Sequence, residues 1–323
     1  MNALTHQRDH GGNLDAAIKR YGGDRWIDLS TGINRTPWPI PSMPQRAWTD
    51  LPTQTDKARL MDAARVAYNT TAPGLALAGA QSAIQLVPSL RDVGLARILG
   101  PTYNEHAAQL IANGWQVEEV GHIDALDGAD LAVVVNPNNP GGEHYTPEQL
   151  LSLKTKVGTL VVDESFGDAR PELSVVSHAN QKGLWVMRSF GKFYGLAGLR
   201  LGFLFADNDT ILNASEMGGP WPVSGIAIEI GCQALMDNAW KQRMIETLRA
   251  DAERLDALAQ QRGWRLAGGT ELFRTYVTPN AADAQQTLAK SQIWTRIFPW
   301  SKELVRIGLP GNEAEWEQLV SAL

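Results

Sequence analysis

The sequence predicts an α/β protein: a large domain with a mostly parallel sheet covered by helices, followed by a smaller C-terminal α+β domain. Two observations indicate this. From about Asp56 to Phe205, short apolar runs alternate with amphipathic stretches, a pattern typical of parallel strands that are buried on both faces and separated by helices. After Asp207 the pattern changes to a long helical stretch and three short strand-like pieces, which indicates a second domain.

The elements of the large domain follow from this alternation. Apolar runs predict strands at residues 75–78, 96–99, 131–135, 159–162, 185–188 and 201–205. Amphipathic stretches predict helices at residues 81–90, 105–113 and 147–157. The run at 131–135 is both apolar and β-branched, which favours a strand over a helix.

The C-terminal part is predicted in the same way. A helix is expected from about Ala239 to Gln261, and Gly263 is a plausible stop because glycine commonly follows a helix end. Strand-like pieces lie at residues 272–277, 293–297 and 304–307, and helix-like stretches lie at 281–291 and 313–323.

A proline-rich connector separates the N-terminal segment from the rest of the chain. Residues 32–44 include Pro37, Pro39, Pro41 and Pro44, and proline disfavours both helix interiors and central strands. We therefore expect an N-terminal arm and connector over residues 1–44, the large domain over 45–206 and the small domain over 207–323. The N-terminal segment is a candidate addition to the small domain.

Length and composition narrow the class of protein. A chain of 323 residues fits two domains, and its 44% hydrophobic and 20% charged residues are those of a globular protein. The net charge of -6 and the lack of a Lys/Arg run give no electrostatic support for a nucleic-acid partner. With Cys232 as the one cysteine, neither a disulfide framework nor a cysteine zinc cluster is expected.

Neither end of the chain suggests a membrane. Residues 1–12 are polar and lack the apolar core of a signal peptide. No apolar run approaches the roughly 20 residues needed to span a bilayer. We therefore expect a cytoplasmic protein without a membrane partner.

The segment from Ser189 to Arg200 is the strongest indication of chemistry. It places Lys192 among small residues just after an expected strand, at the edge where ligands of open α/β sheets bind. The Lys192 amine can reach a bound carbonyl, while the Ser189 hydroxyl and the Arg200 guanidinium suit a phosphate. An aldehyde that carries a phosphate is pyridoxal phosphate, which proteins hold through a lysine Schiff base.

Two further strand ends carry suitable groups. After residues 75–78, Gly79-Ala80-Gln81-Ser82 opens a helix, whose backbone N–H groups can hold a phosphate; an ordinary tight turn is the alternative. After residues 96–99, Tyr103 can present its ring to a flat cofactor, although a structural tyrosine is the commoner case. His106 lies one turn further on and could reach the same pocket or be structural.

The next two strand ends carry an amide and an acid. Residues 136–142 (Asn-Pro-Asn-Asn-Pro-Gly-Gly) form a turn that contains Asn139, a candidate for polar contacts to a ligand ring. Asp163 ends the strongly apolar strand at 159–162, where a buried acid needs a partner. A pyridinium N–H is suitable, worth about 1.5–3 kcal/mol net; a helix cap or a salt bridge is the alternative.

Along the chain the motifs come in the order glycine turn, tyrosine, asparagine turn, acid and lysine. In this order they resemble those of the fold-type I pyridoxal-phosphate enzymes, and more narrowly the group of histidinol-phosphate aminotransferases and threonine-phosphate decarboxylases. The blocks that carry the resemblance are His10-Gly11-Gly12-Asn13, residues 28–34 (Asp-Leu-Ser-Thr-Gly-Ile-Asn), Gly79-Ala80-Gln81, Pro101-Thr102-Tyr103, Asn138-Asn139-Pro140, residues 163–166 (Asp-Glu-Ser-Phe), residues 189–192 (Ser-Phe-Gly-Lys) and Leu304-Val305-Arg306. The first two blocks point to the threonine-phosphate decarboxylases of cobalamin synthesis.

The resemblance implies roles for individual residues. Lys192 would be the Schiff-base lysine, Asp163 the partner of the pyridine nitrogen, Asn139 the partner of the ring 3-oxygen and Tyr103 the stacking ring. The residues expected at the cofactor phosphate are Ala80, Gln81, Ser189 and Arg200. Those expected at the substrate are His10, Gly32, Asn139, Arg296 for the phosphate and Arg306 for the carboxylate. No metal is expected.

The chain departs from its relatives at two positions. Many relatives have a tyrosine where this chain has Phe166, and a phenylalanine there resembles the decarboxylases better than the aminotransferases. Relatives also commonly have a tyrosine near Leu51 that reaches the cofactor phosphate of a neighbouring subunit. Leu51 cannot make that contact.

The function that the resemblance implies is decarboxylation of L-threonine O-3-phosphate to (R)-1-amino-2-propanol O-2-phosphate, for cobalamin biosynthesis. The alternatives are an aminotransferase of the histidinol-phosphate type and a non-catalytic member of the fold. The expected ligand is a small phosphorylated amino acid, and the expected assembly is a homodimer, as in the relatives.

Overall fold

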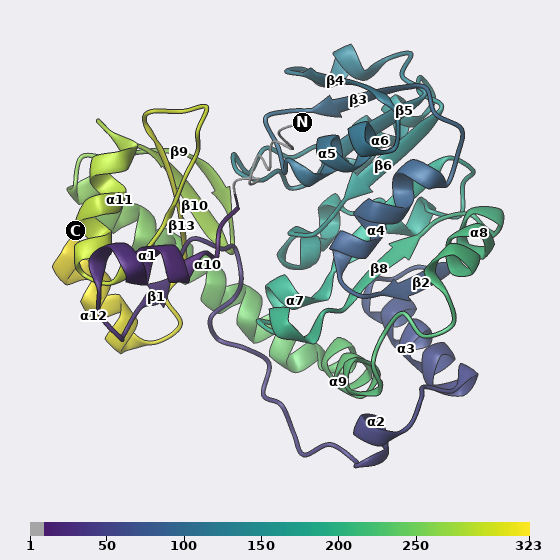
Figure 1. Ribbon diagram of the computed structural model, residues 1–323, viewed down its shortest axis with the longest axis horizontal. Coiled ribbons are helices and arrows are strands. Elements are labelled where there is room, and N and C mark those ends of the chain that lie inside the picture. The colour runs from purple at the N-terminus through teal and green to yellow at the C-terminus, as the bar shows by residue number, and fades with distance from the viewer. Residues whose placement is uncertain (1–9) are drawn as a thin grey trace, which may run out of the picture. The chain divides into compact units, whose positions relative to one another are not determined.

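The computed structural model describes residues 10–323, which divide into two compact units (Figure 1). One unit comprises the chain up to Thr36 together with Glu246–Leu323, and the other comprises Pro37–Ile245. We call them the small unit and the large unit. Helix α10 (Asn238–Gln261) contains the second boundary.

The large unit is built on a seven-stranded sheet with the strand order β2-β8-β7-β6-β5-β3-β4. Strands β7, β6, β5, β3 and β4 are parallel, and β8 is antiparallel to both of its neighbours. The strands are β2 (Gly74–Leu77), β3 (Leu95–Leu99), β4 (Gln116–Val120), β5 (Leu131–Val135), β6 (Thr159–Asp163), β7 (Leu184–Ser189) and β8 (Gly202–Phe205). The prediction of a mostly parallel sheet is confirmed.

Strand β4 was missing from the sequence prediction. Its sequence, Gln-Val-Glu-Glu-Val, is mostly polar, and none of its residues is fully buried. It forms one edge of the sheet, where charged side chains are common because they discourage pairing with another chain. An edge strand therefore escapes a search for apolar runs.

Helices cover this sheet, and several begin at recognisable caps. Thr146 caps α6 (Pro147–Lys154) in a reciprocal arrangement with Gln149, which satisfies two backbone N–H groups at the start of the helix. The other helices of this unit are α2 (Arg46–Thr49), α3 (Gln54–Ala67), α4 (Ala80–Leu86), α5 (Glu105–Ala112), α7 (Phe190–Phe193), α8 (Asn208–Gly218) and α9 (Gly225–Met236). Helices α4 and α5 pack on the sheet, as Figure 1 shows.

The core of the large unit lies between the sheet and these helices. Every residue of β5, β6 and β7 is buried, which explains why these strands appear in the sequence as continuous apolar runs. Ile84 of α4, Leu110 of α5 and Trp115 belong to the same buried cluster as the sheet residues Val133 and Val161. The carboxyl ends of the strands are thereby held on a rigid base.

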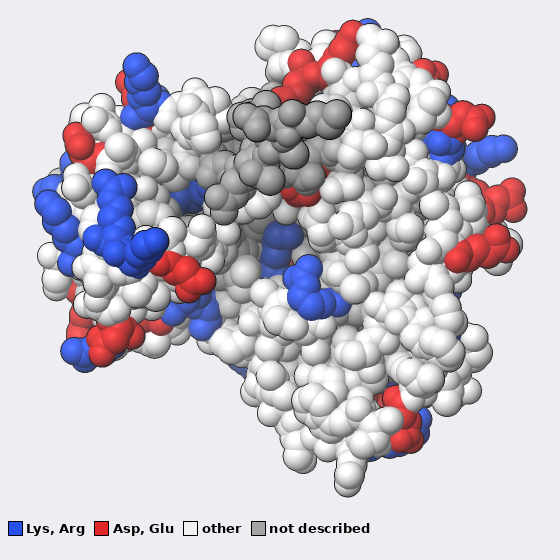
Figure 2. All heavy atoms as spheres, in the orientation of Figure 1, with Lys and Arg blue, Asp and Glu red and all other residues white. Residues whose placement is uncertain are grey.

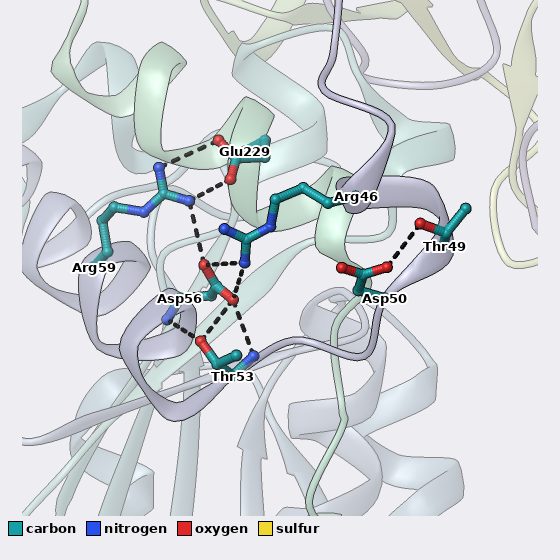
Figure 3. A network of polar contacts seen from close by, with 7 residues as sticks. All are labelled: Arg46, Thr49, Asp50, Thr53, Asp56, Arg59 and Glu229. Atoms are coloured by element: carbon teal, nitrogen blue, oxygen red, sulfur yellow. Dashed lines mark hydrogen bonds and ion pairs between the residues drawn. The ribbon is translucent and has the colours of Figure 1, made fainter.

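Helices α2, α3 and α9 of the large unit are joined by a polar network, drawn in Figure 3. The Thr53 hydroxyl accepts a hydrogen bond from the Asp56 backbone N–H, and Asp56 accepts from Thr53 in return, so that α3 begins with a capping box. Asp56 also pairs with Arg46 of α2 at 3.0 Å. Arg59 of α3 binds Glu229 of α9 through both guanidinium Nη atoms, which ties α2, α3 and α9 together.

The small unit has two sheets. An antiparallel sheet has the order β12-β13-β10-β9, and a two-stranded parallel sheet pairs β1 with β11. The strands are β1 (Ile27–Asp28), β9 (Arg265–Thr270), β10 (Phe273–Val277), β11 (Ile293–Trp294), β12 (Arg296–Ile297) and β13 (Leu304–Gly308), and the helices are α1 (Leu14–Tyr21), α11 (Ala281–Lys290) and α12 (Glu313–Ala322). Since β1 pairs with β11, the N-terminal segment adds to this unit.

The unit boundaries differ from those that the sequence suggested. The large unit begins at Pro37 and extends to Ile245, whereas the sequence analysis placed its limits at residues 45 and 206. Helix α8 contacts β2 of the large sheet, and α9 packs along α3. A change in local pattern at residue 207 therefore did not mark a change of core, because local pattern does not tell which core a helix joins.

The surface carries charges of both signs. On the face drawn in Figure 2, acidic and basic side chains of the described residues are interspersed, without one continuous basic surface. In the part of the chain that is described, the helices are all too short or too polar to cross a bilayer.

Candidate active site

Lys192 lies at the carboxyl end of the large sheet, on the short helix α7 that directly follows β7. Its Nζ donates a hydrogen bond to Ser189 Oγ at 3.2 Å and lies 5.0 Å from the centre of the Phe166 ring. The ring of Phe190 stacks on Tyr194 at 4.3 Å, so α7 is held by aromatic packing. The amine therefore projects from a rigid turn above an apolar ring.

Asp163 is the last residue of β6, the strand beside β7, and only 3% of it is exposed. Its Oδ2 lies 2.9 Å from His106 Nε2, and its Oδ1 accepts from the Ser165 backbone N–H at 2.9 Å. Burial raises the pKa of Asp163, but His106, Lys192 and Ser165 outweigh burial and lower the pKa to about 2. The carboxylate is therefore ionised at neutral pH in a buried position.

His106 is the residue whose role the sequence left open. It lies in α5, and its ring meets Tyr103 edge-on at 6.3 Å. In the structure His106 is the direct partner of Asp163. This is so although β5 lies between β6, which ends at Asp163, and β3, which precedes the helix of His106. The available signal was its position one helical turn after Tyr103, which places both side chains near the same strand end.

The glycine turn before α4 lies against Arg200. Gly79 has a φ of 80°, and a Cβ placed there would lie 2.8 Å from Arg200 Nη2. Gly202 is paired with Ser189 across β7 and β8, and a Cβ on Gly202 would collide with the backbone N of Ala80. Because Gly79 and Gly202 have no side chains, Ala80, Ser189 and Arg200 lie close together. The sequence analysis expects these three residues at the cofactor phosphate, which remains a prediction.

Two of the remaining cofactor candidates, Tyr103 and Gln81, are joined by a hydrogen bond. Tyr103 Oη donates to Gln81 Oε1 at 3.3 Å, and Gln81 Nε2 donates to Glu105 Oε2 at 3.2 Å. Half-buried Asn139 lies in the loop after β5. Its neighbour Asn138 accepts from Thr102 Oγ1 at 2.7 Å, which ties the loops after β3 and β5 to each other.

Two arginines face each other on neighbouring strands of the small unit. Arg296 of β12 is the register partner of Arg306 of β13. Arg306 is buried, its Nη2 donates to the Ser30 carbonyl at 2.5 Å, and its guanidinium lies over the Phe273 ring at 5.0 Å. Burial, followed by the charge of Arg296, lowers the pKa of Arg306, with Asp28 opposing. A bound anion would relieve this unfavourable pair of positive charges.

The N-terminal motif blocks also meet within the small unit. The Gly12 backbone N–H donates to Ser30 Oγ at 2.7 Å, and that hydroxyl donates to Asp28 Oδ1 at 2.6 Å. His10 is exposed, while Gly32 is buried. Since the Ser30 carbonyl binds Arg306, both blocks lie beside the arginine predicted to bind substrate.

The donor set in the large unit suits a flat aldehyde that carries a phosphate. It contains an amine at Lys192, a buried and ionised acid at Asp163 and an apolar ring at Phe166 below the amine. The turn at Gly79 leaves backbone approachable next to the Arg200 guanidinium, which fits a dianionic group. Among the described residues, groups of acids, histidines or cysteine suited to a metal ion are absent.

Comparisons with known proteins give one consistent family. Residues 59–323 match the family described as aminotransferase class I and II. The chain is 41% identical to a threonine-phosphate decarboxylase of Pseudomonas aeruginosa, with 98% of this chain and 97% of that protein covered. It is 43% identical to a threonine-phosphate decarboxylase of a Sinorhizobium species, with 97% of each covered.

A solved structure supports the fold. The histidinol-phosphate aminotransferase from Sinorhizobium meliloti in complex with pyridoxal-5'-phosphate superposes with a TM-score of 0.83 at 17% identity. The match covers 100% of this chain and 96% of that one. At this identity the similarity supports the architecture alone.

Proposed function

The chain belongs to the aminotransferase class I and II family, and we propose that it is a pyridoxal-phosphate-dependent decarboxylase. Its proposed reaction converts L-threonine O-3-phosphate into (R)-1-amino-2-propanol O-2-phosphate and CO2, for cobalamin biosynthesis. One observation carries the choice of substrate: the two threonine-phosphate decarboxylases are similar to this chain along nearly its whole length. The fit of the large unit's donor set to pyridoxal phosphate supports the choice of cofactor.

When bound, pyridoxal phosphate supplies an electron sink for the electron pair that the departing CO2 leaves behind. The role of Asp163 is to hold a proton on the pyridine nitrogen, which its low pKa permits. Tyr103 and Asn139 are assigned to the ring. Ala80, Gln81, Ser189 and Arg200 are assigned to the phosphate. Lys192 binds the aldehyde carbon.

Lys192 has a second proposed role as a proton donor. The carbon that loses CO2 must gain one proton to give the amine product. The Lys192 amine, on the rigid α7 turn, would hold that proton and deliver it to the reacting carbon. Its hydrogen-bond partner Ser189 orients it for that transfer.

Arg306 and Arg296 are proposed to bind the two anionic groups of the substrate, the carboxylate and the phosphate respectively. His10, Gly32 and Asn139 are the further residues proposed to bind the substrate. In an aminotransferase such an arginine would hold the carboxylate so that the Cα–H bond is the bond that breaks. In a decarboxylase the Cα–carboxylate bond must break instead. We propose that anchoring through the phosphate shifts the substrate to achieve this.

The test is to supply threonine phosphate without a keto acid. Release of one CO2 per substrate, with the cofactor still in its aldehyde form, is the expected result. Conversion that depends on 2-oxoglutarate would identify an aminotransferase instead. A purified chain that forms no borohydride-reducible adduct on the peptide containing Lys192 would contradict catalysis of either kind and indicate a non-catalytic member of the fold.

We further propose that the working form is a cytoplasmic homodimer. Around α2, large apolar side chains are exposed, with Trp48 at 70% and Leu51 at 65%. A second copy of the chain would cover such side chains. Sedimentation velocity should give about twice the chain mass, and a monomer at micromolar concentration would contradict the assembly without touching the proposed chemistry.

A further inference from the structure

A buried ionic cluster lies directly behind the proposed cofactor site. Arg188 of β7 is 2% exposed and stands four residues before Lys192. Its Nη1 donates to Glu164 Oε2 at 2.7 Å, and its Nη2 pairs with Asp168 Oδ1 at 3.1 Å. Its guanidinium also lies over the Tyr68 ring at 4.3 Å. One cation therefore joins two carboxylates that belong to the loop after β6.

The loop begins directly after Asp163 and carries Ser165 and Phe166. Asp163 ends β6, Ser165 donates its backbone N–H to Asp163 Oδ1 at 2.9 Å, and Phe166 lies below the Lys192 amine. The last backbone hydrogen bond between the two strand ends joins Glu164 N to the Met187 carbonyl at 3.0 Å. Beyond that bond the loop leaves the sheet and turns on its own backbone hydrogen bond from Gly167 N to the Glu164 carbonyl at 2.9 Å. Side chains then join the loop to β7.

Arg188 holds the loop at two points. Glu164, just after Asp163, is fixed by Arg188 and also by Ser174 Oγ at 2.6 Å and Val175 N at 2.8 Å. Asp168, two residues beyond Phe166, is fixed by Arg188 from the other side. The guanidinium packs closely on the loop backbone, because a Cβ on Gly167 would lie 3.1 Å from Arg188 Nη1. Ser165 and Phe166 thus lie between two anchored carboxylates.

The cluster is an inefficient way to gain stability. Burial favours the neutral form of both Arg188 and Glu164, and their mutual attraction, with that of Asp168, opposes it. Buried ion pairs often contribute little compared with apolar side chains of similar size, because desolvation offsets the attraction. The hydrogen bond to Glu164 is directional, and the same planar guanidinium forms an ion pair with Asp168, so one side chain holds two carboxylates at once.

We propose that Arg188 is a positioning residue that sets Asp163 and Phe166 relative to Lys192 by bridging the end of β7 to the loop after β6. The strand that leads to the lysine and the loop that follows the acid then move as one body. This inference rests on the proposed function only in that pyridoxal phosphate must bind at Lys192. It does not depend on which amino acid is the substrate.

The test compares Arg188→Lys with the unchanged chain. Lysine keeps the charge but cannot bind two carboxylates in a fixed fork. We expect the variant to bind one cofactor per chain, with an altered visible circular dichroism of that cofactor. We expect kcat on threonine phosphate to fall on the order of 10- to 100-fold, with KM changed far less, because small misplacements of reacting groups act on kcat.

Two control variants separate positioning from general loss of stability. Arg274→Lys removes a similar fork, since Arg274 binds Asp256 through Nε at 3.0 Å and Nη2 at 2.6 Å. Tyr68→Phe removes a buried hydroxyl, keeps the ring that packs on Arg188 and leaves both carboxylate contacts of Arg188 in place. Both variants should retain the visible circular dichroism of the cofactor. Their kcat should stay within about twofold of the unchanged chain, because sites that do not interact usually affect each other by less than about 0.5 kcal/mol.

The outcomes decide the inference. An Arg188→Lys variant with an unchanged visible signal and unchanged kcat would overturn the positioning role, whatever its thermal stability. Should Arg188→Lys fail to fold, Asp168→Asn decides in its place: it keeps the size of the side chain, weakens one arm of the bridge and should lower kcat with an altered signal. An unaltered chain that binds no pyridoxal phosphate would contradict the proposed function itself and this inference with it.

Discussion

At the scale of single residues, the site depends on keeping one buried carboxylate ionised. Asp163 achieves this through His106 on one oxygen and a backbone N–H on the other. Desolvation alone would favour the protonated acid, which could not hold a proton on a pyridine nitrogen. In the proposed mechanism, His106 therefore supports Asp163 by keeping its carboxylate ionised.

Asp163→Asn should separate charge from hydrogen bonding. The amide retains the size of the carboxylate but loses about 3 kcal/mol of charge stabilisation, so we expect kcat to fall on the order of 10²-fold. Steady-state CO2 release measures this. Asp209→Asn, the same change at an exposed position of α8, is the control. Turnover near that of the unchanged chain in Asp163→Asn would refute the electron-sink role.

His106→Gln should change how stability depends on pH. The folded-state pKa of Asp163 is about 2, below the pKa of 3.8 of an unperturbed aspartate. The contribution of this carboxylate to stability is therefore present above pH 3.8 and is lost as pH falls through 2. The contribution of the ionised Asp163 to the free energy of unfolding is about 2 kcal/mol. Since the variant raises this pKa, its deficit in unfolding free energy should be largest above about pH 4 and shrink at lower pH.

Urea unfolding of cofactor-depleted protein, from pH 7 down to the acid limit of the folded state, measures that deficit. A deficit that stays constant, or grows toward low pH, would show that His106 acts through packing and not through the charge of Asp163.

At the scale of elements, the short connections after strands hold the proposed phosphate site. The turn before α4 needs glycine at residue 79 for two reasons, a positive φ and the close approach of Arg200. The chain supplies a matched position, because Gly219 also has a positive φ, 73°, but has no atom within 4 Å of a Cβ placed on it.

Gly79→Ala and Gly219→Ala should therefore differ in one property. Both place alanine in a conformation with positive φ and extended ψ that is almost restricted to glycine, so both should lose roughly 1–3 kcal/mol of stability. Only Gly79→Ala should also weaken binding of pyridoxal phosphate, by roughly 10-fold or more, because it displaces Arg200. Cofactor titration followed by visible absorbance measures this. Equal affinities in the two variants would exclude the turn from the phosphate site.

The capping box of α3 allows a prediction about stability alone. Thr53→Ala removes the hydroxyl that accepts from the Asp56 N–H and should cost about 1 kcal/mol in unfolding free energy. Thr71→Ala, the same change at an exposed loop position, should cost much less. Denaturant unfolding compares them, and equal losses would mean that the cap in Figure 3 contributes nothing measurable.

At the scale of the whole molecule, cofactor and stability should be linked. A ligand that binds only the folded chain stabilises it by about 2.7 kcal/mol at 100 times its Kd. Removing pyridoxal phosphate should therefore lower the thermal midpoint, and adding it back should restore the midpoint in a concentration-dependent way. Inorganic phosphate at the same concentration is the control, and an equal effect of both would indicate binding of an anion only.

The family and the sheet were predictable because their signals are local. The buried strands β5, β6 and β7 are continuous apolar runs, and the residues that follow each run are adjacent in the sequence. The polar edge strand β4 and the membership of α8 and α9 in the large unit were not predictable in this way. Each depends on which surface the element packs against.

The sequence by itself determined that an amine, an acid, an amide and a glycine turn each come at the end of a strand of the same sheet. This set of groups indicated which cofactor to expect. Only the tertiary structure decided which distant side chains support them. His106 reaches Asp163 across the position of β5, and Arg188 bridges to Glu164 and Asp168. The physical reason is that strand order places these residues together, and strand order is a property of the folded sheet that no local pattern of side chains encodes.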